Sequence, residues 1–322
     1  MPNTSTTSGA AAVIAAICAG SLQPPGGSTV DGTLTWSCEP KKSASEASRA
    51  SKCRAITASS PASVAYRIGS NDFSSCHTCT TSSRECRMGR AEIGQDLYTP
   101  ATSKNNPVPA PGSRPNAGWL YVSQTARSLR ASRSDELTLT FGVTGRPSLG
   151  KFTQTIAHNA APTFNRPSDW SDQVGFEPGL AARYEQRRRI GQDDRAIGFD
   201  VIPRFALTAG NVSTAAEIGL QTRTGWHLRH PWLPRDGPLE IALTGGVSAR
   251  AVARDLFLDG NTFRDGPHVG HEVFVGSGEI AVLIRFRALS LAYRAVNDTR
   301  SYAAGPKWHP WASIVGGVTF GR

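Results

Sequence analysis

Hydrophobic and polar residues alternate along much of the chain after residue 90. The clearest segments are 137–143, which reads Leu-Thr-Leu-Thr-Phe-Gly-Val, and 240–244, which reads Glu-Ile-Ala-Leu-Thr. A period of two places successive side chains on opposite faces of a β-strand. The same pattern covers 118–127, 198–209, 214–226, 246–257, 269–275, 278–296 and 312–320. Clusters of Gly, Pro, Asn and Asp separate these segments, which indicates many strands joined by turns, as in a barrel or a sandwich.

Two other segments favour helices. Residues 150–160 follow a Pro-Ser-Leu-Gly turn, and residues 177–189 begin with a Glu-Pro pair. An acidic residue and a proline are typical of the first turn of a helix. We therefore expect two helices between the strands.

Length and composition narrow the choice of class. The chain has 322 residues, of which 39% are hydrophobic. It contains no run of about 18 apolar residues, so a transmembrane helix is excluded and a closed β-barrel is the only membrane-spanning structure left. A barrel is compatible with this average composition because only alternate strand residues face lipid.

The charge of the chain suggests acidic partners. Its formal net charge is +10 and its isoelectric point is about 9.7. The basic residues are scattered over strands and turns, and no zinc finger, helix-turn-helix or aromatic RNA-binding signature accompanies them, so we expect no nucleic-acid partner. Arginine pairs well with phosphate oxygens, which fits a protein that lies among lipid phosphates. A basic periplasmic binding protein is the alternative that charge alone supports.

The chain divides into three regions. Residues 1–30 form a poor signal-like segment: 10–19 is apolar, but no Lys or Arg precedes it. Residues 31–90 are rich in Cys and Ser and show little alternation. Residues 91–322 contain no cysteine and form the predicted β-barrel domain.

The cysteines are confined to the first 90 residues. Cys76, His77, Cys79 and Cys86 have the elements of a zinc site, but their spacing fits no strong pattern of four compact ligands. A disulfide between Cys76 and Cys79 is favoured over zinc in an oxidising compartment. The sequence therefore identifies no set of metal ligands.

The irregular region has two explanations. The segments Trp-Ser-Cys at 36–38 and Cys-Arg-Ala-Ile-Thr at 53–57 look like peptides that result when the codons of a β-strand are read in a shifted frame. Two compensating frame changes near 36 and 90 would disrupt the N-terminal strands and leave an open sheet edge. The other explanation is a divergent, disordered extension. If no alternative frame of codons 36–90 encodes alternating strands, the frame-shift hypothesis fails.

From residue 94 onward the sequence resembles the lipid A 3-O-deacylase family of outer-membrane proteins. Six segments in the family's order carry the resemblance: Gly-Gln-Asp-Leu-Tyr-Thr-Pro at 94–100, Arg-Pro-Asn-Ala-Gly-Trp-Leu-Tyr at 114–121, the glycine-rich strand and turn at 139–150, Gln154-x-x-x-His158, Ser-Asp-Trp-Ser-Asp-Gln at 168–173 with Glu-Pro at 177–178, and Leu-Asp-Gly-Asn-Thr-Phe at 258–263. The resemblance covers residues 91–322. It implies an all-β, antiparallel outer-membrane β-barrel of about 12 strands.

The resemblance also implies a reaction, a cofactor and partners. The expected activity is calcium-dependent hydrolysis of the ester that holds the 3-position acyl chain on lipid A, within lipopolysaccharide. His158 stands where the family has its catalytic histidine, and a neutral imidazole is a suitable base for activating water. Lys104 lies in the loop where the family has an assisting lysine.

The partner of the histidine is less clear in this sequence. The family has an acidic residue shortly after the histidine, whereas 159–167 contains no carboxylate. Asp169 and Asp172 are the nearest candidates for a supporting role, ahead of Glu177, which suits a turn or a helix start. Two hypotheses follow: an active deacylase with His158 as base, or an inactive or lipid-binding barrel of the same descent.

Overall fold

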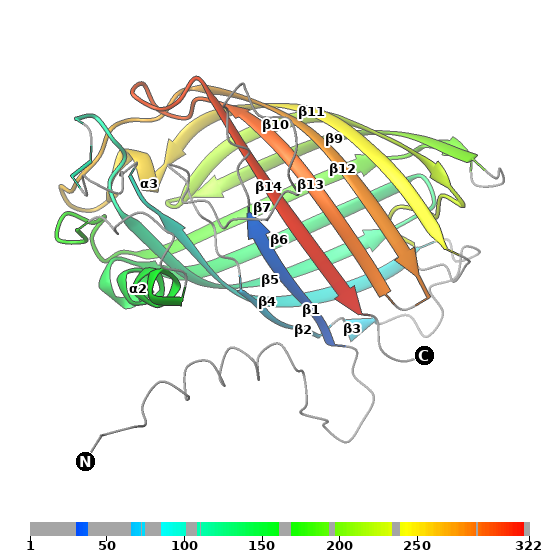
Figure 1. The fold of residues 1–322 in the computed structure, drawn as a ribbon, viewed down its shortest axis with the longest axis horizontal. Helices are drawn as coiled ribbons and strands as arrows, with labels where there is room; N and C mark the ends of the chain where they lie inside the picture. Colours follow the sequence, from blue (N-terminus) through cyan, green and yellow to red (C-terminus); the bar gives the residue numbers. More distant parts are fainter. Residues whose placement is uncertain are drawn as a thin grey trace, which may run out of the picture.

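The computed structural model describes residues 30–37, 66–71, 73–74, 85–100, 108–109, 111–160, 169–192, 197–233, 239–287 and 289–318. For 30–37, 66–71, 73–74, 88, 157–160, 192, 314–315 and 317–318 the backbone alone is described. In this part of the chain, fourteen strands form one antiparallel sheet that curves around a lumen (Figure 1). No helix among the described residues is both long and apolar enough to cross a membrane.

The strands are, in chain order, β1 (Val30–Ser37), β2 (Tyr66–Asn71), β3 (Phe73–Ser74), β4 (Cys86–Tyr98), β5 (Ala117–Leu129), β6 (Arg133–Thr144), β7 (Pro178–Arg188), β8 (Ile190–Gln192), β9 (Ile197–Gly210), β10 (Ser213–Trp226), β11 (Glu240–Asp255), β12 (Phe274–Phe286), β13 (Leu289–Thr299) and β14 (Trp308–Val318). The helices are the 3-10 turn η1 (Arg146–Ser148), α2 (Gly150–Ala160) and α3 (Leu256–Asp259).

The order of the strands brings the two ends of the sheet together. It runs β2-β1-β14-β13-β12-β11-β10-β9-β7-β6-β5-β4-β3, and β8 also pairs with β9. The hydrogen-bonded order is open, but its end strands β2 and β3 are separated in sequence by residue 72 alone, and β2 lies against β4. If β2 with β3 and β7 with β8 are each counted once, the described sheet has the twelve strands that the resemblance implies.

The observed elements confirm the all-β outer-membrane barrel and correct three expectations. The helix expected over 177–189 is the strand β7, in which Leu180 is exposed while Glu185 is buried. Its many polar residues belong to the lumen face of a strand, so the Glu-Pro pair starts a strand. The segment 278–296 is divided between β12 and β13, and the strand expected over 269–275 starts only at Phe274.

Residues 31–90 contain more strand than their pattern indicates. The structure has β1, β2 and β3 in or beside this region, and β4 begins at Cys86. The segments β2 and β3 are six and two residues long, too short to show a period in the sequence. The frame-shift hypothesis stays a prediction that the nucleotide sequence tests.

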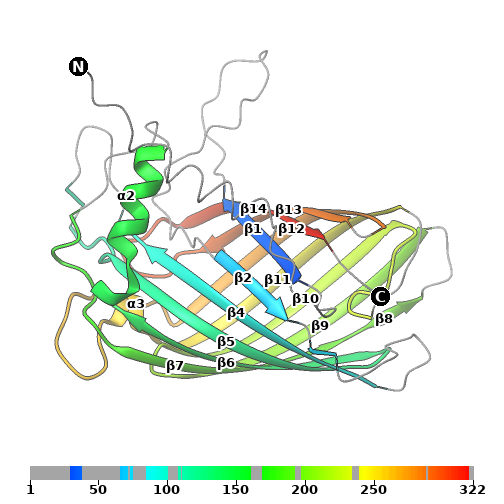
Figure 2. The same ribbon diagram turned by 90° about the horizontal axis from the view of Figure 1, so that it is seen from below.

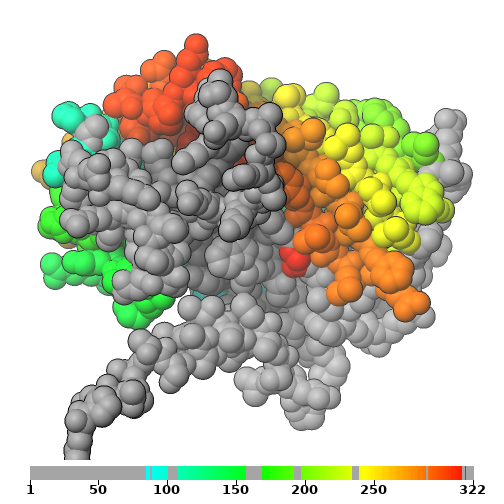
Figure 3. Space-filling view, in the orientation of Figure 1, coloured from blue at the N-terminus to red at the C-terminus, as the bar shows by residue number. Residues whose placement is uncertain are grey.

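The wall is apolar outside and polar inside. On β10, Ile218 and Leu220 are exposed and point outward. Glu217 precedes Ile218 and points to the other face, where its carboxylate pairs with Arg183 of β7 at 3.4 Å and with Arg204 of β9 at 2.5 Å. Apolar residues therefore face away from the lumen, which is the reverse of a water-soluble barrel and is what lipid requires. Figure 3 shows the outer surface over β10 to β13, yellow to orange, as a continuous convex wall.

One end of the lumen is crossed by a loop. Residues 227–233 follow β10 at the end opposite α2 and α3. His230 Nε2 donates to the carbonyl oxygen of Ala131 at 2.8 Å, and Trp232 Nε1 donates to that of Arg130 at 2.7 Å. Both acceptors lie in the β5–β6 turn, three strands away from β10 in the sheet. Since Leu233 is also buried, in a cluster with Cys86 and Leu129, the loop forms a floor across the lumen.

Charged side chains fill the lumen above this floor. Asp200 and Glu240 have no exposed surface, and Arg223 donates to both, at 3.2 and 3.4 Å. Glu240 also accepts from Arg285 at 3.2 Å and from the backbone N–H of Arg229 at 3.0 Å. Buried charges are tolerated only when they are paired in this way. The network ties the floor loop to β9, β10, β11 and β12.

We expect the double variant His230→Ala/Trp232→Ala to release the floor loop. It removes two hydrogen bonds to the β5–β6 turn, which contribute about 1 kcal/mol each, and the apolar contact of the indole. Amide hydrogen exchange of 228–233 should become at least about tenfold faster, since about 1.4 kcal/mol is a factor of ten. Trp308→Ala, at the other end of the barrel, is the control. Unchanged exchange would show that these bonds do not hold the floor.

Candidate active site

Helix α2 packs on the outside of the barrel wall. Its contacts are with β4 and β5, and Figures 1 and 2 both show it beside these strands rather than within the lumen. On β4 the exposed residue Ile93 marks the outward face, and Gln95 and Leu97 continue that face but are buried. Gln95 Nε2 donates to the carbonyl oxygen of Ser148, in the turn before the helix. The helix therefore covers a part of the wall that would otherwise face lipid.

Two glycines allow this close approach. A Cβ atom on Gly118 of β5 would lie 2.1 Å from the hydroxyl oxygen of Ser148. A Cβ atom on Gly150, the first residue of α2, would lie 2.6 Å from a ring carbon of Trp170. Neither contact can be relieved without moving the turn or the indole. The absence of side chains at 118 and 150 therefore sets how near the helix comes to the wall.

Trp170 determines which face of α2 is turned toward the loop that contains it. The indole is only 3% exposed, and its Nε1 donates to Oε1 of Gln154 on the helix. Residues four apart lie on the same face of an α-helix, so position 158 follows position 154 on the Trp170 face, about 6 Å further along the axis. The helix backbone thus places His158 on the outer side of the barrel.

The segment after Trp170 passes over the rim into the lumen. Asn116 Nδ2 donates to the carbonyl oxygen of Asp169 at 2.7 Å, and the carbonyl of Asn116 accepts from the N–H of Val174 at 2.8 Å. Val174 is fully buried in the core cluster with Trp119 and Phe257. One buried asparagine therefore anchors both the outer and the inner part of this loop.

Glu177 anchors the end of the loop. Its carboxylate is 3% exposed and accepts from Asn211 Nδ2 at 2.8 Å, Asn261 Nδ2 at 3.1 Å and the N–H of Thr262 at 2.7 Å. Burial raises the pKa of Glu177, but the hydrogen bonds from Thr262, Asn261 and Asn211 outweigh it, so the pKa lies below its usual value. With its acceptors engaged, Glu177 holds three loops together and has no free oxygen for catalysis.

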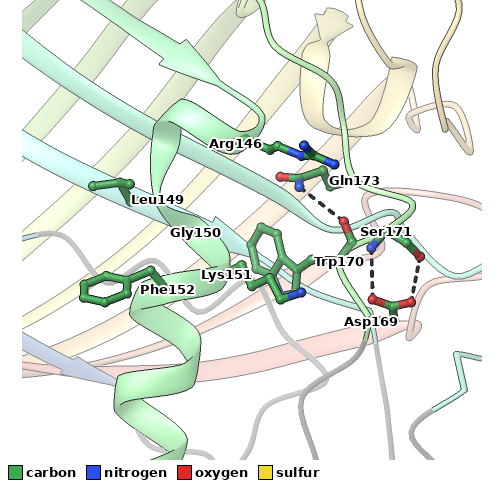
Figure 4. Close-up of a pocket in the computed structure, with 9 residues that line it drawn as sticks. All are labelled: Arg146, Leu149, Gly150, Lys151, Phe152, Asp169, Trp170, Ser171 and Gln173. Carbon is green, nitrogen blue, oxygen red and sulfur yellow. Dashed lines mark hydrogen bonds between the residues drawn. The ribbon is translucent and has the colours of Figure 1, made fainter.

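A groove of about 510 Å³ lies between the first turn of α2 and the loop before Glu177 (Figure 4). Its lining combines cations with apolar side chains: Arg146, Leu149, Gly150, Lys151, Phe152, Asp169, Trp170, Ser171 and Gln173. In Figure 4 Trp170 lies beside the first turn of the helix, and Asp169 and Ser171 lie on the far side of the indole. The groove and position 158 thus share one helix on the outer side of the wall.

The family model described as outer membrane protein LpxR matches residues 46–320. The chain belongs to the LpxR family. The match confirms the resemblance to lipid A 3-O-deacylases and the outer membrane as the location of the protein. It begins at residue 46, so it also takes in 46–90, which the quoted motifs do not cover.

Solved structures agree with this family. LpxR from Salmonella typhimurium superposes with a TM-score of 0.68 at 14% identity, covering 91% of this chain and 100% of that one. At this identity the likeness shows the fold alone. The β domain of the Bordetella autotransporter BrkA has a TM-score of 0.45 at 9% identity, covering 91% and 99% of the two chains, and carries no argument. A search of curated protein sequences finds no match.

The structure brings together only part of the predicted site. His158 lies on α2, but its side chain is outside the described residues, as is Lys104 altogether. Asp169 lines the groove at the first turn of α2, which is about two helical turns from position 158. The Asp169 carboxylate accepts from the hydroxyl of Ser171 at 2.7 Å and from the N–H of Ser171 at 3.1 Å. These bonds lower the pKa of Asp169. Asp172 is exposed on the same loop.

Sequence reasoning missed the groove residues Arg146 and Lys151. The only signal for them is the Pro-Ser-Leu-Gly turn, which places two cations on either side of a helix start. A turn of this kind says nothing about what packs against it. Their role became visible only when Trp170, from a distant loop, was placed beside Gly150.

The described residues offer no cluster of ligands for calcium. No three carboxylate or histidine side chains converge in this part of the chain. Calcium takes six to eight oxygen ligands, and the oxygens of Glu177 are bound by amides while those of Asp169 are bound by Ser171. The described residues therefore do not fit the ion, and calcium stays a prediction that the family resemblance makes.

We expect Gly118→Val to displace α2 from the wall. The new side chain meets Ser148, so the turn before the helix must move outward. Hydrogen exchange of 150–156 should speed up by about tenfold or more, since overpacking typically costs 1–3 kcal/mol. The control is Gly278→Val in β12, where an added Cβ meets nothing within 4 Å. Equal protection of α2 in both variants would contradict the close approach.

Proposed function

We propose that this LpxR-family protein hydrolyses the ester that attaches the 3-position acyl chain to lipid A. The observation that carries the proposal is the docking of α2, with His158, on the outer face of the wall. The acyl esters of lipid A join its sugar headgroup to its acyl chains and so lie at the boundary of the apolar layer. A site outside the wall meets such an ester without drawing the lipid into the charged lumen.

The proposed chemistry uses His158 as a general base. Neutral His158 takes a proton from water as the water oxygen attacks the ester carbonyl carbon. The C–O bond to the sugar then breaks, and the proton passes from the imidazole to the sugar oxygen. The products are a free fatty acid and a sugar hydroxyl. Positioned proton transfer of this kind contributes about 10²–10⁴ in rate.

Two supporting roles belong to the proposal. A cation near the carbonyl oxygen would stabilise the developing oxyanion, and Lys104 is the candidate by resemblance. An orienting group for the imidazole is not found among the described carboxylates. Asp169 lies at the first turn of α2, about two helical turns from position 158, and its carboxylate is bound by Ser171. Asp172 is exposed. We therefore assign the base and leave its orienter unassigned.

That observation favours a second candidate function. Since 159–167 contain no carboxylate, the barrel can retain its lipid-binding outer face and lack the reaction. A catalytically inactive, lipid-binding barrel of the LpxR family is therefore the alternative. It predicts binding of lipid A without any change in its acylation.

The lipid A of cells that express this chain in their outer membrane distinguishes the two functions. We expect mass spectrometry to show loss of the 3-linked acyl chain, and His158→Ala to reduce this product by about 10²–10⁴. His268→Ala, at an exposed histidine whose ring hydrogen-bonds to the carbonyl oxygen of Gly266, is the matched control. Unchanged lipid A with correctly inserted protein would overturn the hydrolase and leave the inactive barrel.

Calcium is a separate part of the proposal. If the family's cofactor acts here, chelation in isolated outer membranes should abolish release of the acyl chain, and added calcium should restore it where magnesium does not. Magnesium is the control because it demands tighter octahedral geometry and keeps its waters. Full activity in excess chelator would remove calcium from the proposal and leave His158 in place.

A further inference from the structure

The groove at the start of α2 carries two cations. Among the described residues, the side chains of Arg146 and Lys151 make no hydrogen bond or ion pair, whereas arginines of the wall, such as Arg223 and Arg294, pair with acids. The one acid in the groove, Asp169, is bound by Ser171 and stays ionised because these bonds lower its pKa. Two cations against one engaged carboxylate leave the groove with a positive charge.

Two exposed apolar side chains line the same groove as these cations. Leu149 is 53% exposed and Phe152 is 63% exposed, and both line the groove. Leu149 has a φ of +60°, a left-handed backbone conformation that is costly for a residue with a branched side chain. Such strain persists where the surrounding structure enforces it, often at ligand sites. Here the left-handed residue ends the 3-10 turn and holds a large apolar side chain exposed at the groove.

Cations next to exposed apolar residues match one kind of ligand. A phosphorylated lipid presents a phosphate to the cations and acyl chains to the apolar residues, and arginine binds phosphate with two parallel hydrogen bonds. The groove shares α2 with His158, which lies seven residues beyond Lys151 and so about 10 Å along the axis. A lipid whose sugar headgroup carries both phosphate and acyl esters can contact both places at once.

We propose that this groove is a phosphate subsite for lipid A. Arg146 and Lys151 bind a phosphate of the glycolipid, and Leu149 and Phe152 contact its acyl chains. The subsite makes the protein specific for phosphorylated lipid A and aligns the ester with the helix position of His158. This inference rests on the proposed function for its substrate, but its binding test does not require turnover.

The test measures binding to full-length protein in detergent, in the His158→Ala background so that no lipid is consumed. The probes are bisphosphorylated lipid A and the same lipid A after removal of its phosphates. We expect Arg146→Gln/Lys151→Gln to weaken binding of the phosphorylated lipid by about 10- to 100-fold, as for loss of charge-assisted hydrogen bonds, and to leave the other lipid unaffected. Phe152→Ser should weaken both lipids.

The control variant is Arg300→Gln/Lys307→Gln, which removes the same charge from the loop between β13 and β14 at the same end of the barrel. Heat-modified mobility on a gel verifies that each variant is folded. Three results overturn the subsite: unchanged binding of phosphorylated lipid A, an equal loss in the control variant, or an equal loss for both lipids. Vesicles of anionic phospholipid that compete as well as lipid A would also overturn it, in favour of a general lipid surface.

The results for the subsite and for the hydrolase are separable. If the wild-type protein leaves lipid A unchanged but binds it through Arg146 and Lys151, the proposed reaction fails and the subsite stands. If the protein removes the acyl chain equally well from phosphorylated and dephosphorylated lipid A, the reaction stands and the subsite fails.

Discussion

A backbone that crosses a membrane must satisfy its N–H and C=O groups within the protein, and the rest of this structure depends on that constraint. It explains why the first strand, β1, pairs with the last, β14, across almost the whole length of the chain. The same constraint explains why β2 and β3 matter: β2 pairs with β1 at one end of the strand order, and β3 pairs with β4 at the other end. In this LpxR-family protein, the junction between β1 and β4 is therefore formed by β2 and β3, which belong to the part of the sequence with the least regular pattern.

The same wall sets the electrostatics of the interior. Since lipid occupies the outer face, the polar half of each strand points into the lumen, where an unpaired buried charge is costly. The acids Glu217 and Glu240 therefore each pair with more than one arginine from other strands. Together with the floor loop, this pairing gives the described part of the lumen a charged interior.

The proposed chemistry on a lipid takes place on the outer face, which is otherwise apolar. Helix α2 provides the exception, because Gly118 and Gly150 let it dock on β4 and β5 and cover the polar side chain of Gln95. Trp170 and the loop to Glu177 fasten the helix from the other side of the rim. The helix with His158 and the groove with Arg146 are thus two results of one packing arrangement.

The sequence by itself determined the class of the protein. A period of two in strands such as 137–143, without a long apolar run, leaves a membrane barrel, and the order of its motifs indicated the family. Local pattern failed where polar residues face the lumen, so β7 resembled a helix, and where strands are short, as in β2. Only the tertiary structure decided which residues meet at the site. Asn116 with Asp169, and Trp170 with Gly150, are joined across separate loops. Such contacts depend on strand register and rim geometry, which arise from the whole sheet and leave no periodic signal in the chain.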